Sequence, residues 1–380
     1  MYILLSLIIV LLIFSISFPY IIKGIRVVYF TGHTSAFIDD TKYFDTDTVN
    51  KGCVQHWDLH DNYNKVTPTK NLIDTGERLG TVAYMIVKND QIFYENYAKG
   101  YSKDKLTNSF SMAKSITTAL LFKAIDEGFM KSLDQKVIEY YPEIKGEYAH
   151  LLTLGDLASM ATGLNWDEAY TNPFSITAQA YYKKNIKNII LGLQVNELPG
   201  KSFNYISGAT QLLGMCIEKA TKQSLSNYLT ASFWQPMGMH SNAEWQLDSK
   251  ESGMTKCYCC LASNARDFAR FGQIWMKDGL WNGQQLISKD LVQKAKTARF
   301  KEAPQYGYGL WLSDYKNKKI SYMRGILGQY VICIPEDDIM IIRLGHKRDD
   351  VDDAGNPGQD FYTYIDEAYE MLNQKLNDKH

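Results

Sequence analysis

The sequence predicts an α+β fold in which both ends of the chain build an antiparallel sheet, helices flank it, and a helical subdomain is inserted in the middle. Three observations lead to this prediction. Strand-like runs occur within residues 82–97, helical patterns dominate residues 150–297, and strand-like runs return within residues 308–344. Separate runs of strands and helices are typical of α+β proteins, whose sheet and helices occupy different layers.

Length and composition limit the functions that the chain can have. Its 380 residues are 45% hydrophobic, which is ample material for a core shared by two intertwined subdomains. The net charge of -1 creates no long-range attraction to nucleic acid, which we exclude as a partner. The 26 tyrosines argue against a disordered scaffold, because such chains are poor in aromatic residues.

The first segment, residues 1–22, is expected to be a membrane anchor. Ile3 to Ile22 contains no charged residue and is long enough to cross a bilayer as a helix. A cleaved signal peptide is the alternative, but no basic segment precedes the apolar run and no small-x-small cleavage site lies around Ser15 to Pro19. Lys23 and Arg26 follow the run, so the positive-inside rule would place the next segment in the cytoplasm.

Residues 23–80 are polar and lack sustained periodicity, so we expect an extended arm that lies over the main domain, residues 81–380. That domain begins with two β-rich runs, Val82 to Val87 and Ile92 to Tyr97. Asn89-Asp90 lies between them and predicts a hairpin turn.

A long buried helix is predicted from Ser111 to Gly128, because apolar residues recur at helical spacing between them. Later helices are expected in the middle of the chain and at its end, at Thr210 to Ala220, Ala265 to Met276 and Phe361 to Leu372. Later strands, the last two joined by a Pro335 to Asp338 turn, are expected at Tyr308 to Leu312, Tyr330 to Ile334 and Ile339 to Leu344.

The pattern Ser-x-x-Lys at Ser111-Met112-Ala113-Lys114 predicts a nucleophilic serine. A lysine three residues along a helix lies on the same face as the serine, where it can help remove the hydroxyl proton. Ser102 and Ser313 begin the same pattern, but they lie in polar, turn-like stretches. Ser111 instead precedes a long helix, whose free amide groups can stabilise an oxyanion. The competing interpretation of Ser111 is an ordinary helix cap.

A second segment strengthens the prediction. Pro199 to Gly208 forms a loop that leads into a helix, and Tyr205 and Ser207, two residues apart, would point to one side of an extended turn. A tyrosine near a lysine ammonium has its phenolate favoured, so Tyr205 can exchange protons with the serine and the leaving group.

These motifs resemble the serine β-lactamase and D,D-peptidase superfamily. Ser111-Met112-Ala113-Lys114 followed by Tyr205-Ile206-Ser207 is most similar to the branch of class C β-lactamases, family VIII esterases and 6-aminohexanoate-dimer hydrolases. Further similar blocks, in the same order, are Leu154 to Leu164, Trp234 to Met239 and Ala265 to Gly272. The resemblance implies a β-lactamase/transpeptidase-like fold, with an active site between the sheet and the helical subdomain.

The third motif of these relatives departs from the pattern. They carry Lys-Thr-Gly or His-x-Gly on a strand beside the site, whereas this chain has Met323-Arg324-Gly325-Ile326. The backbone at Gly325 and Ile326 can still supply an oxyanion amide, since that role needs no side chain. Arg324 either replaces the missing charge or faces solvent. His346 follows the last strand, where relatives place a polar residue at the edge of the site, or is a surface histidine.

Other candidates carry less weight. Trp166 and Tyr170 either line the substrate cleft or pack in the core. His56 and His60 have metal-ligand spacing but no helical pattern around them, so we expect no metal and no cofactor. The six cysteines are interpreted mainly as buried apolar residues, although Cys53 can pair with another.

We therefore expect a serine hydrolase that acts on a small ester, amide or peptide through an acyl-enzyme at Ser111. The base is Lys114 or Tyr205, and Ser207 supports their network. The alternative is a non-hydrolytic, membrane-anchored ligand-binding or penicillin-binding-like sensor of the same fold, suggested by the altered third motif. The expected location is the membrane, with the domain on the periplasmic or cell-surface side, opposite to the charge rule. The oligomeric state stays open.

Overall fold

The computed structural model describes residues 2–352 and 354–374, and its centre is a seven-stranded sheet. The strand order is β10-β11-β12-β13-β3-β4-β2, so strands from both chain ends meet where β13 pairs with β3. Every pairing is antiparallel except that of β2 with β4. The strands are β2 (Asp58–Leu59), β3 (Thr81–Lys88), β4 (Gln91–Tyr97), β10 (Trp311–Tyr315), β11 (Lys318–Gly325), β12 (Gln329–Ile334) and β13 (Ile339–Gly345). The predicted sheet is confirmed.

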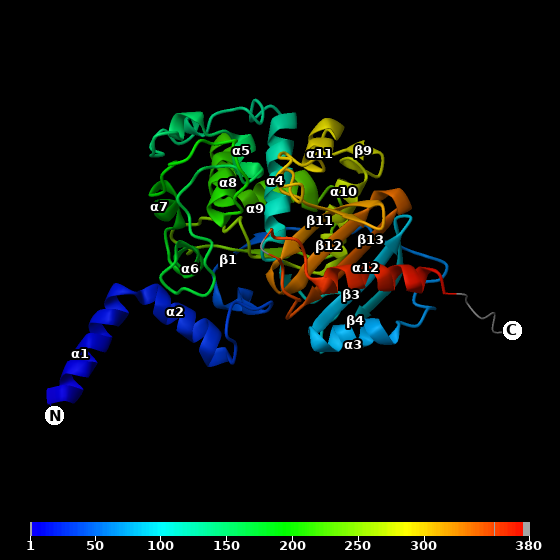
Figure 1. Ribbon diagram of the computed structural model, residues 1–380, viewed down its shortest axis with the longest axis horizontal. Coiled ribbons are helices and arrows are strands. Elements are labelled where there is room, and N and C mark those ends of the chain that lie inside the picture. Colours follow the sequence, from blue (N-terminus) through cyan, green and yellow to red (C-terminus); the bar gives the residue numbers. More distant parts are fainter. Residues whose placement is uncertain (1, 353, 375–380) are drawn as a thin grey trace.

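Helices cover both faces of this sheet. Cys333 and Val331 of β12 contact Gly272 of α10 (Ala265–Met276), whereas Tyr330, the residue before Val331, contacts Phe361 of α12 (Gln359–Leu372). Successive residues of a strand point to opposite faces, so the two helices lie on opposite sides. Figure 1 shows α12 crossing one face of the strands.

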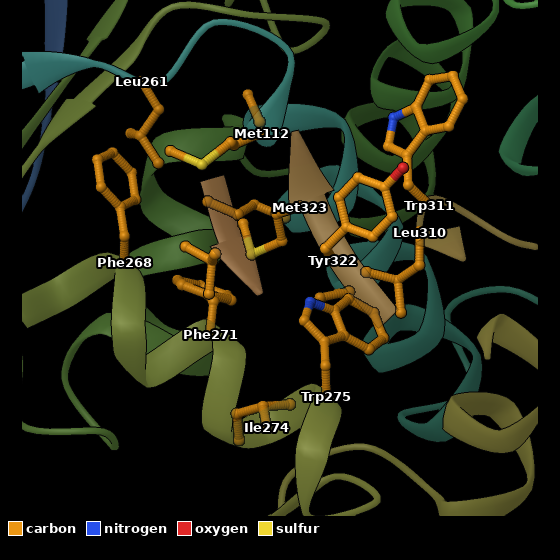
Figure 2. Packing of buried hydrophobic residues seen from close by; sticks show 14 of the residues in the cluster. Met112, Leu261, Phe268, Phe271, Ile274, Trp275, Leu310, Trp311, Tyr322 and Met323 are labelled. Carbon is orange, nitrogen blue, oxygen red and sulfur yellow. The ribbon is translucent and has the colours of Figure 1, made fainter. Parts of the chain in front are cut away.

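The core between α10 and the sheet extends to the start of the predicted long helix. That helix, α4 (Met112–Asp126), is buried along almost its whole length. Figure 2 shows Met112 of α4 grouped with Phe271 of α10 and Met323 of β11, all in one buried cluster. This packing fixes the beginning of α4 against the end of β11.

The middle of the chain is less purely helical than the sequence predicts. It contains α5 (Leu154–Ala158), α6 (Ile176–Tyr182), α7 (Ile186–Leu191), α8 (Ser207–Thr221), α9 (Leu225–Leu229), β8 (Leu280–Trp281), β9 (Gln284–Gln285) and α11 (Lys289–Ala295). It also contributes β6 (Ala243–Gln246) and β7 (Leu261–Ser263) to a second sheet with β1 (Thr46–Val49) and β5 (Thr107–Asn108). β6 and β7 pair with each other across residues 247–260 and with β1 and β5 from earlier in the chain, so these two strands have no local hairpin pattern.

The N-terminal segment differs from the expected single apolar helix. Phe18 is not helical and separates α1 (Tyr2–Ser17) from α2 (Pro19–Val28), because the residue before a proline disfavours helical geometry. In the part of the chain that the structure describes, no helix has the length and apolarity needed to cross a membrane. Figure 1 shows α1 extending away from the rest of the chain.

The arm, residues 23–80, is also not simply extended. It contains most of α2, the strands β1 and β2, and α3 (Lys70–Arg78), which is capped by the Thr69 hydroxyl. Leu72 and Thr75 are the buried residues of α3. Two buried positions in a short polar helix give no clear apolar periodicity in the sequence.

One local prediction was wrong, and one possibility that the sequence left open is not realised. The strand expected at Tyr308 to Leu312 begins at Trp311, because Gly309 has a positive φ of 72° and packs against Thr118. Cys53 forms no disulfide: it is exposed, and the structure joins Cys259 to Cys260 instead. The interpretation of Cys216, Cys257 and Cys333 as buried is confirmed.

Candidate active site

Ser111 lies at the N-cap of α4, directly after a residue with unusual backbone geometry. Phe110 has a positive φ of 45°, a region that bulky L-residues rarely occupy. Hydrogen bonds close the first turn of α4. The backbone N–H groups of Met112, Ala113 and Lys114 donate to the carbonyl oxygens of Ser109, Phe110 and Ser111, respectively. The amide of Ser111 takes no part in these bonds, and it stands at the positive end of the helix dipole.

Lys114 is only 2% exposed and its ammonium contacts three oxygen atoms. Lys114 Nζ lies 3.0 Å from Ser111 Oγ, 3.0 Å from Ser207 Oγ and 2.9 Å from the carbonyl oxygen of Tyr258. The structure thus brings together Ser111, Lys114 and Ser207, as predicted from the motifs. Three acceptors match the three donors of a protonated lysine.

Ser207 connects Lys114 to a carboxylate that the sequence analysis missed. Ser207 opens α8, so it does not lie in the extended turn that we expected. Its hydroxyl donates to Glu168 Oε1 at 2.6 Å and its amide donates to Glu168 Oε2 at 2.7 Å. Because the hydroxyl proton points to Glu168, a lone pair of Ser207 Oγ faces Lys114.

Trp166 and Tyr170 hold the same carboxylate from the other side. Trp166 is 7% exposed and donates its indole N–H to Glu168 Oε2 at 2.6 Å. Tyr170 is 55% exposed, and its hydroxyl donates to Glu168 Oε1 at 2.5 Å. The two candidate cleft residues are therefore linked to Ser207 through Glu168. Their spacing on either side of Glu168 was the only sequence signal that pointed to this carboxylate.

Tyr205 lies beside the lysine. Lys114 Nζ is 5.1 Å from the centre of the Tyr205 ring, a distance at which a cation is attracted to an aromatic face. The Tyr205 ring also contacts Trp311 at 5.1 Å and Tyr306 at 5.9 Å between centroids. These aromatic contacts limit the positions that the Tyr205 hydroxyl can adopt.

The end of β11 reaches residues 109–111, which we call the nucleophile segment. A side chain at Gly325 would place its Cβ 2.3 Å from the Ser109 carbonyl oxygen, so only glycine allows this approach. The following turn, Ile326–Gly328, is held by buried Arg343, which donates to the carbonyls of Leu327 and Gly328 at 2.9 and 2.8 Å. The predicted second amide donor near Ile326 therefore belongs to a tightly anchored turn.

Arg324 and His346 are placed differently from each other. The Arg324 guanidinium stacks 3.6 Å from the centre of the Trp311 ring, on the aromatic group that contacts Tyr205, and donates to the Gly355 carbonyl at 2.6 Å. His346 packs against Gly80 and Tyr101. Burial lowers the pKa of His346. Among the described residues, no contact joins His346 to Ser111, Lys114 or Tyr205.

The surroundings of Lys114 are poor in water. Burial raises the pKa of the Tyr258 hydroxyl well above its usual value, and burial likewise raises the pKa of the Cys257 thiol. Both residues therefore stay neutral beside Lys114. Within the described residues, no three His, Cys, Asp or Glu side chains are grouped to hold a metal ion. Lys114 and Glu168 are joined through the Ser207 hydroxyl.

Three comparisons relate this geometry to known proteins. Residues 69–363 match the family model described as Beta-lactamase. The 6-aminohexanoate-dimer hydrolase of Paenarthrobacter ureafaciens is 22% identical over 70% of this chain and 73% of its own length. Protein flp of Staphylococcus aureus is 28% identical over 41% of this chain, which spans about a third of that protein (33%). A solved structure assigned as a 6-aminohexanoate-dimer hydrolase of Bacillus anthracis has a TM-score of 0.75 at 20% identity, over 88% of this chain and 92% of that one.

Proposed function

The chain belongs to the beta-lactamase family and is a hydrolytic enzyme, and from that premise we propose that it cleaves small esters, amides or peptides through an acyl-enzyme at Ser111. One observation carries the proposal. A buried lysine ammonium lies 3.0 Å from the Ser111 hydroxyl and 3.0 Å from the Ser207 hydroxyl, which itself binds Glu168. A lysine used only for structure would not need the exposed end of a helix and a second hydroxyl in this arrangement.

The proposed reaction begins with attack of Ser111 Oγ on the substrate carbonyl. The three N–H groups of Lys114 are already directed at oxygen atoms, so Tyr205 is the group that accepts the Ser111 proton. Tyr205 lies beside this lysine, whose Nζ is 5.1 Å from the centre of the Tyr205 ring. The amides of Ser111 and of the Ile326 turn hold the oxyanion. Tyr205 then protonates the leaving group, and water releases the acyl group from Ser111.

The direct test is covalent labelling. The purified chain is incubated with a fluorescent fluorophosphonate or a fluorescent penicillin and compared with Ser111→Ala by gel fluorescence. Ser102→Ala is the matched control, because Ser102 begins the same Ser-x-x-Lys pattern on an exposed turn. We expect wild type and Ser102→Ala to be labelled and Ser111→Ala to remain unlabelled. Equal labelling of all three proteins would refute the proposal.

Turnover separates the hydrolase from the alternative sensor. A hydrolase releases p-nitrophenol from a p-nitrophenyl ester over many cycles, whereas a sensor stops after one equivalent and retains the acyl group. Intact-protein mass spectrometry during the reaction measures that adduct. We expect multiple turnovers and an adduct that disappears when the substrate is exhausted.

We also propose that α1 attaches the chain to a membrane, with the domain outside the cytoplasm. The support is the exposed apolar surface of α1, on which Tyr2, Ile3 and Ile16 are 81%, 80% and 72% exposed. Such surface is costly in water. Reporter fusions at the C-terminus give the orientation, and removal of residues 2–17 is expected to release the protein from the membrane fraction.

A further inference from the structure

Asp40 is a fully buried carboxylate in the N-terminal arm, outside residues 69–363 that match the family. Its Oδ1 accepts hydrogen bonds from Asn108 Nδ2 at 2.9 Å and from Gln246 Nε2 at 3.2 Å. Its Oδ2 accepts one from the Tyr181 hydroxyl at 2.6 Å. Burying a carboxylate is costly unless its hydrogen bonds are made, so this position calls for an explanation.

Asn108 forms hydrogen bonds both to Asp40 and to the nucleophile segment. While its Nδ2 donates to Asp40, its Oδ1 accepts the backbone N–H of Phe110 at 2.9 Å, one residue before Ser111. The arm also holds the Asn108 backbone, because the Ile38 carbonyl accepts the Asn108 amide at 2.8 Å. Two hydrogen bonds thus connect the arm to the strand that precedes Ser111.

The orientation of the Asn108 amide depends on Asp40. A side-chain amide can rotate by half a turn and exchange its donor and acceptor ends. A carboxylate accepts only, so Asp40 favours the orientation in which Asn108 Oδ1 faces Phe110. The Tyr181 hydroxyl, which donates to Asp40, accepts from the same Asn108 Nδ2 at 3.3 Å. That acceptor is needed because Phe110 has a φ of 45°, a conformation that is unfavourable for a bulky residue and persists only when its surroundings enforce it.

We propose that Asp40 is a positioning residue of the active site, which acts through Asn108 to hold Phe110 in the backbone conformation that presents Ser111 to Lys114. The inference rests on the proposed function of Ser111. It assigns a role in the active site to Asp40, a residue of the arm that lies outside the family match. Without Asp40, the Asn108 amide can turn over and Phe110 can relax, which moves Ser111 relative to Lys114 and the amide donors.

The test measures the second-order rate constant of fluorophosphonate labelling on the full chain, at a temperature where far-UV circular dichroism shows each variant folded. Asp40→Ala is expected to label at least about tenfold more slowly, because small displacements of reacting groups have large kinetic effects. Asp40→Asn keeps an acceptor for Asn108 and can donate to Tyr181, so its rate is expected within about threefold of wild type. Asp45→Ala removes another carboxylate of the arm, one bonded to the Lys250 amide, and should label at the wild-type rate.

A double-mutant cycle distinguishes positioning from general stability. If Asp40 acts through Asn108, then Asp40→Ala combined with Asn108→Ala labels no more slowly than Asn108→Ala alone. If Asp40→Ala does not fold, Asn108→Ala breaks the same connection and is expected to show the same loss. A wild-type rate in a folded Asp40→Ala or Asn108→Ala protein, or fully additive losses, overturns this inference alone. A wild type that does not label at Ser111 overturns the proposed function as well.

Discussion

Glu168 binds Ser207 twice, through a 2.6 Å bond from the Ser207 hydroxyl and a 2.7 Å bond from its amide. Trp166 and Tyr170 complete a set of four donors around the two carboxylate oxygens. Ser207 in turn lies 3.0 Å from Lys114 Nζ. Glu168 therefore sets the direction of the Ser207 hydroxyl that contacts the buried lysine.

The first prediction concerns this carboxylate. The four groups around Glu168 all donate hydrogen bonds. In Glu168→Gln the side-chain NH2 also donates, so the Ser207 hydroxyl loses its defined orientation. We expect kcat for a p-nitrophenyl ester to fall about 10- to 100-fold while KM changes less than about threefold. Glu197→Gln, an exposed carboxylate on a nearby loop, is the control and should behave as wild type. An unchanged kcat in Glu168→Gln would show that Ser207 does not need the carboxylate.

The second prediction concerns the approach of β11 to the nucleophile segment. In Gly325→Ala the new Cβ would lie 2.3 Å from the Ser109 carbonyl oxygen, so β11 or the nucleophile segment must move. We expect a lower melting temperature and a labelling rate at least about tenfold lower. Gly76→Ala in α3 has no neighbour closer than 3.7 Å and should leave both quantities at or above the wild-type values. Similar behaviour of the two variants would contradict the close approach.

The third prediction tests whether the positive charge of Arg324 serves the substrate. Arg324→Met keeps an apolar side chain on Trp311 but removes the guanidinium that stacks there. If the charge faces the cleft, KM for an ester with a carboxylate group is expected to rise about tenfold, while KM for a neutral ester stays unchanged. Lys316→Met, an exposed cation of the sheet edge, should change neither value. Equal effects on both esters would assign Arg324 to packing.

The fourth prediction is a pH dependence of stability. Loss of hydration on burial raises the pKa of Glu218 to about 7. The hydrogen bond from the Leu225 amide opposes this rise, and the nearby Asp47 and Asp248 add to it. In the unfolded chain this group titrates near 4.5, so the folded protein binds the proton more tightly. The penalty for ionisation is therefore absent below pH 4.5, grows as the pH rises, and is complete above pH 7.

Glu218→Gln cannot ionise and removes this penalty. We expect the free energy of unfolding of wild type, relative to Glu218→Gln, to fall by about 2 kcal/mol between pH 5 and pH 8. Urea unfolding at several pH values measures the difference. Parallel pH profiles of the two proteins would show that Glu218 stays hydrated in the folded state.

The fifth prediction concerns cysteine reactivity. Native alkylation is expected to modify Cys53, which is exposed, and to spare the buried Cys216, Cys257 and Cys333. Unfolding without a reductant should expose these three, and only reduction should release Cys259 and Cys260. Peptide mass spectrometry after each step locates the labels. Alkylation of Cys259 before reduction would exclude the disulfide.

Features that depend on neighbours along the chain could be predicted from the amino-acid sequence. The Ser111 to Lys114 spacing places two side chains on one face of a helix, and the structure contains that helix as α4. The Asn89-Asp90 turn, with both residues at positive φ, follows equally from local geometry. The altered third motif is also a local fact, visible as Arg324 before Gly325.

Contacts between distant segments could not be predicted in this way, because they form only when the chain folds. Ser207 reaches Lys114 across 93 positions, and Asp40 reaches Asn108 across 68. No periodicity records such pairs, because they arise when sheets and helices pack and a buried polar group must find a partner. For the same reason Glu168 was missed: a carboxylate in a loop has no local pattern, and its importance comes from the four donors that the fold places around it.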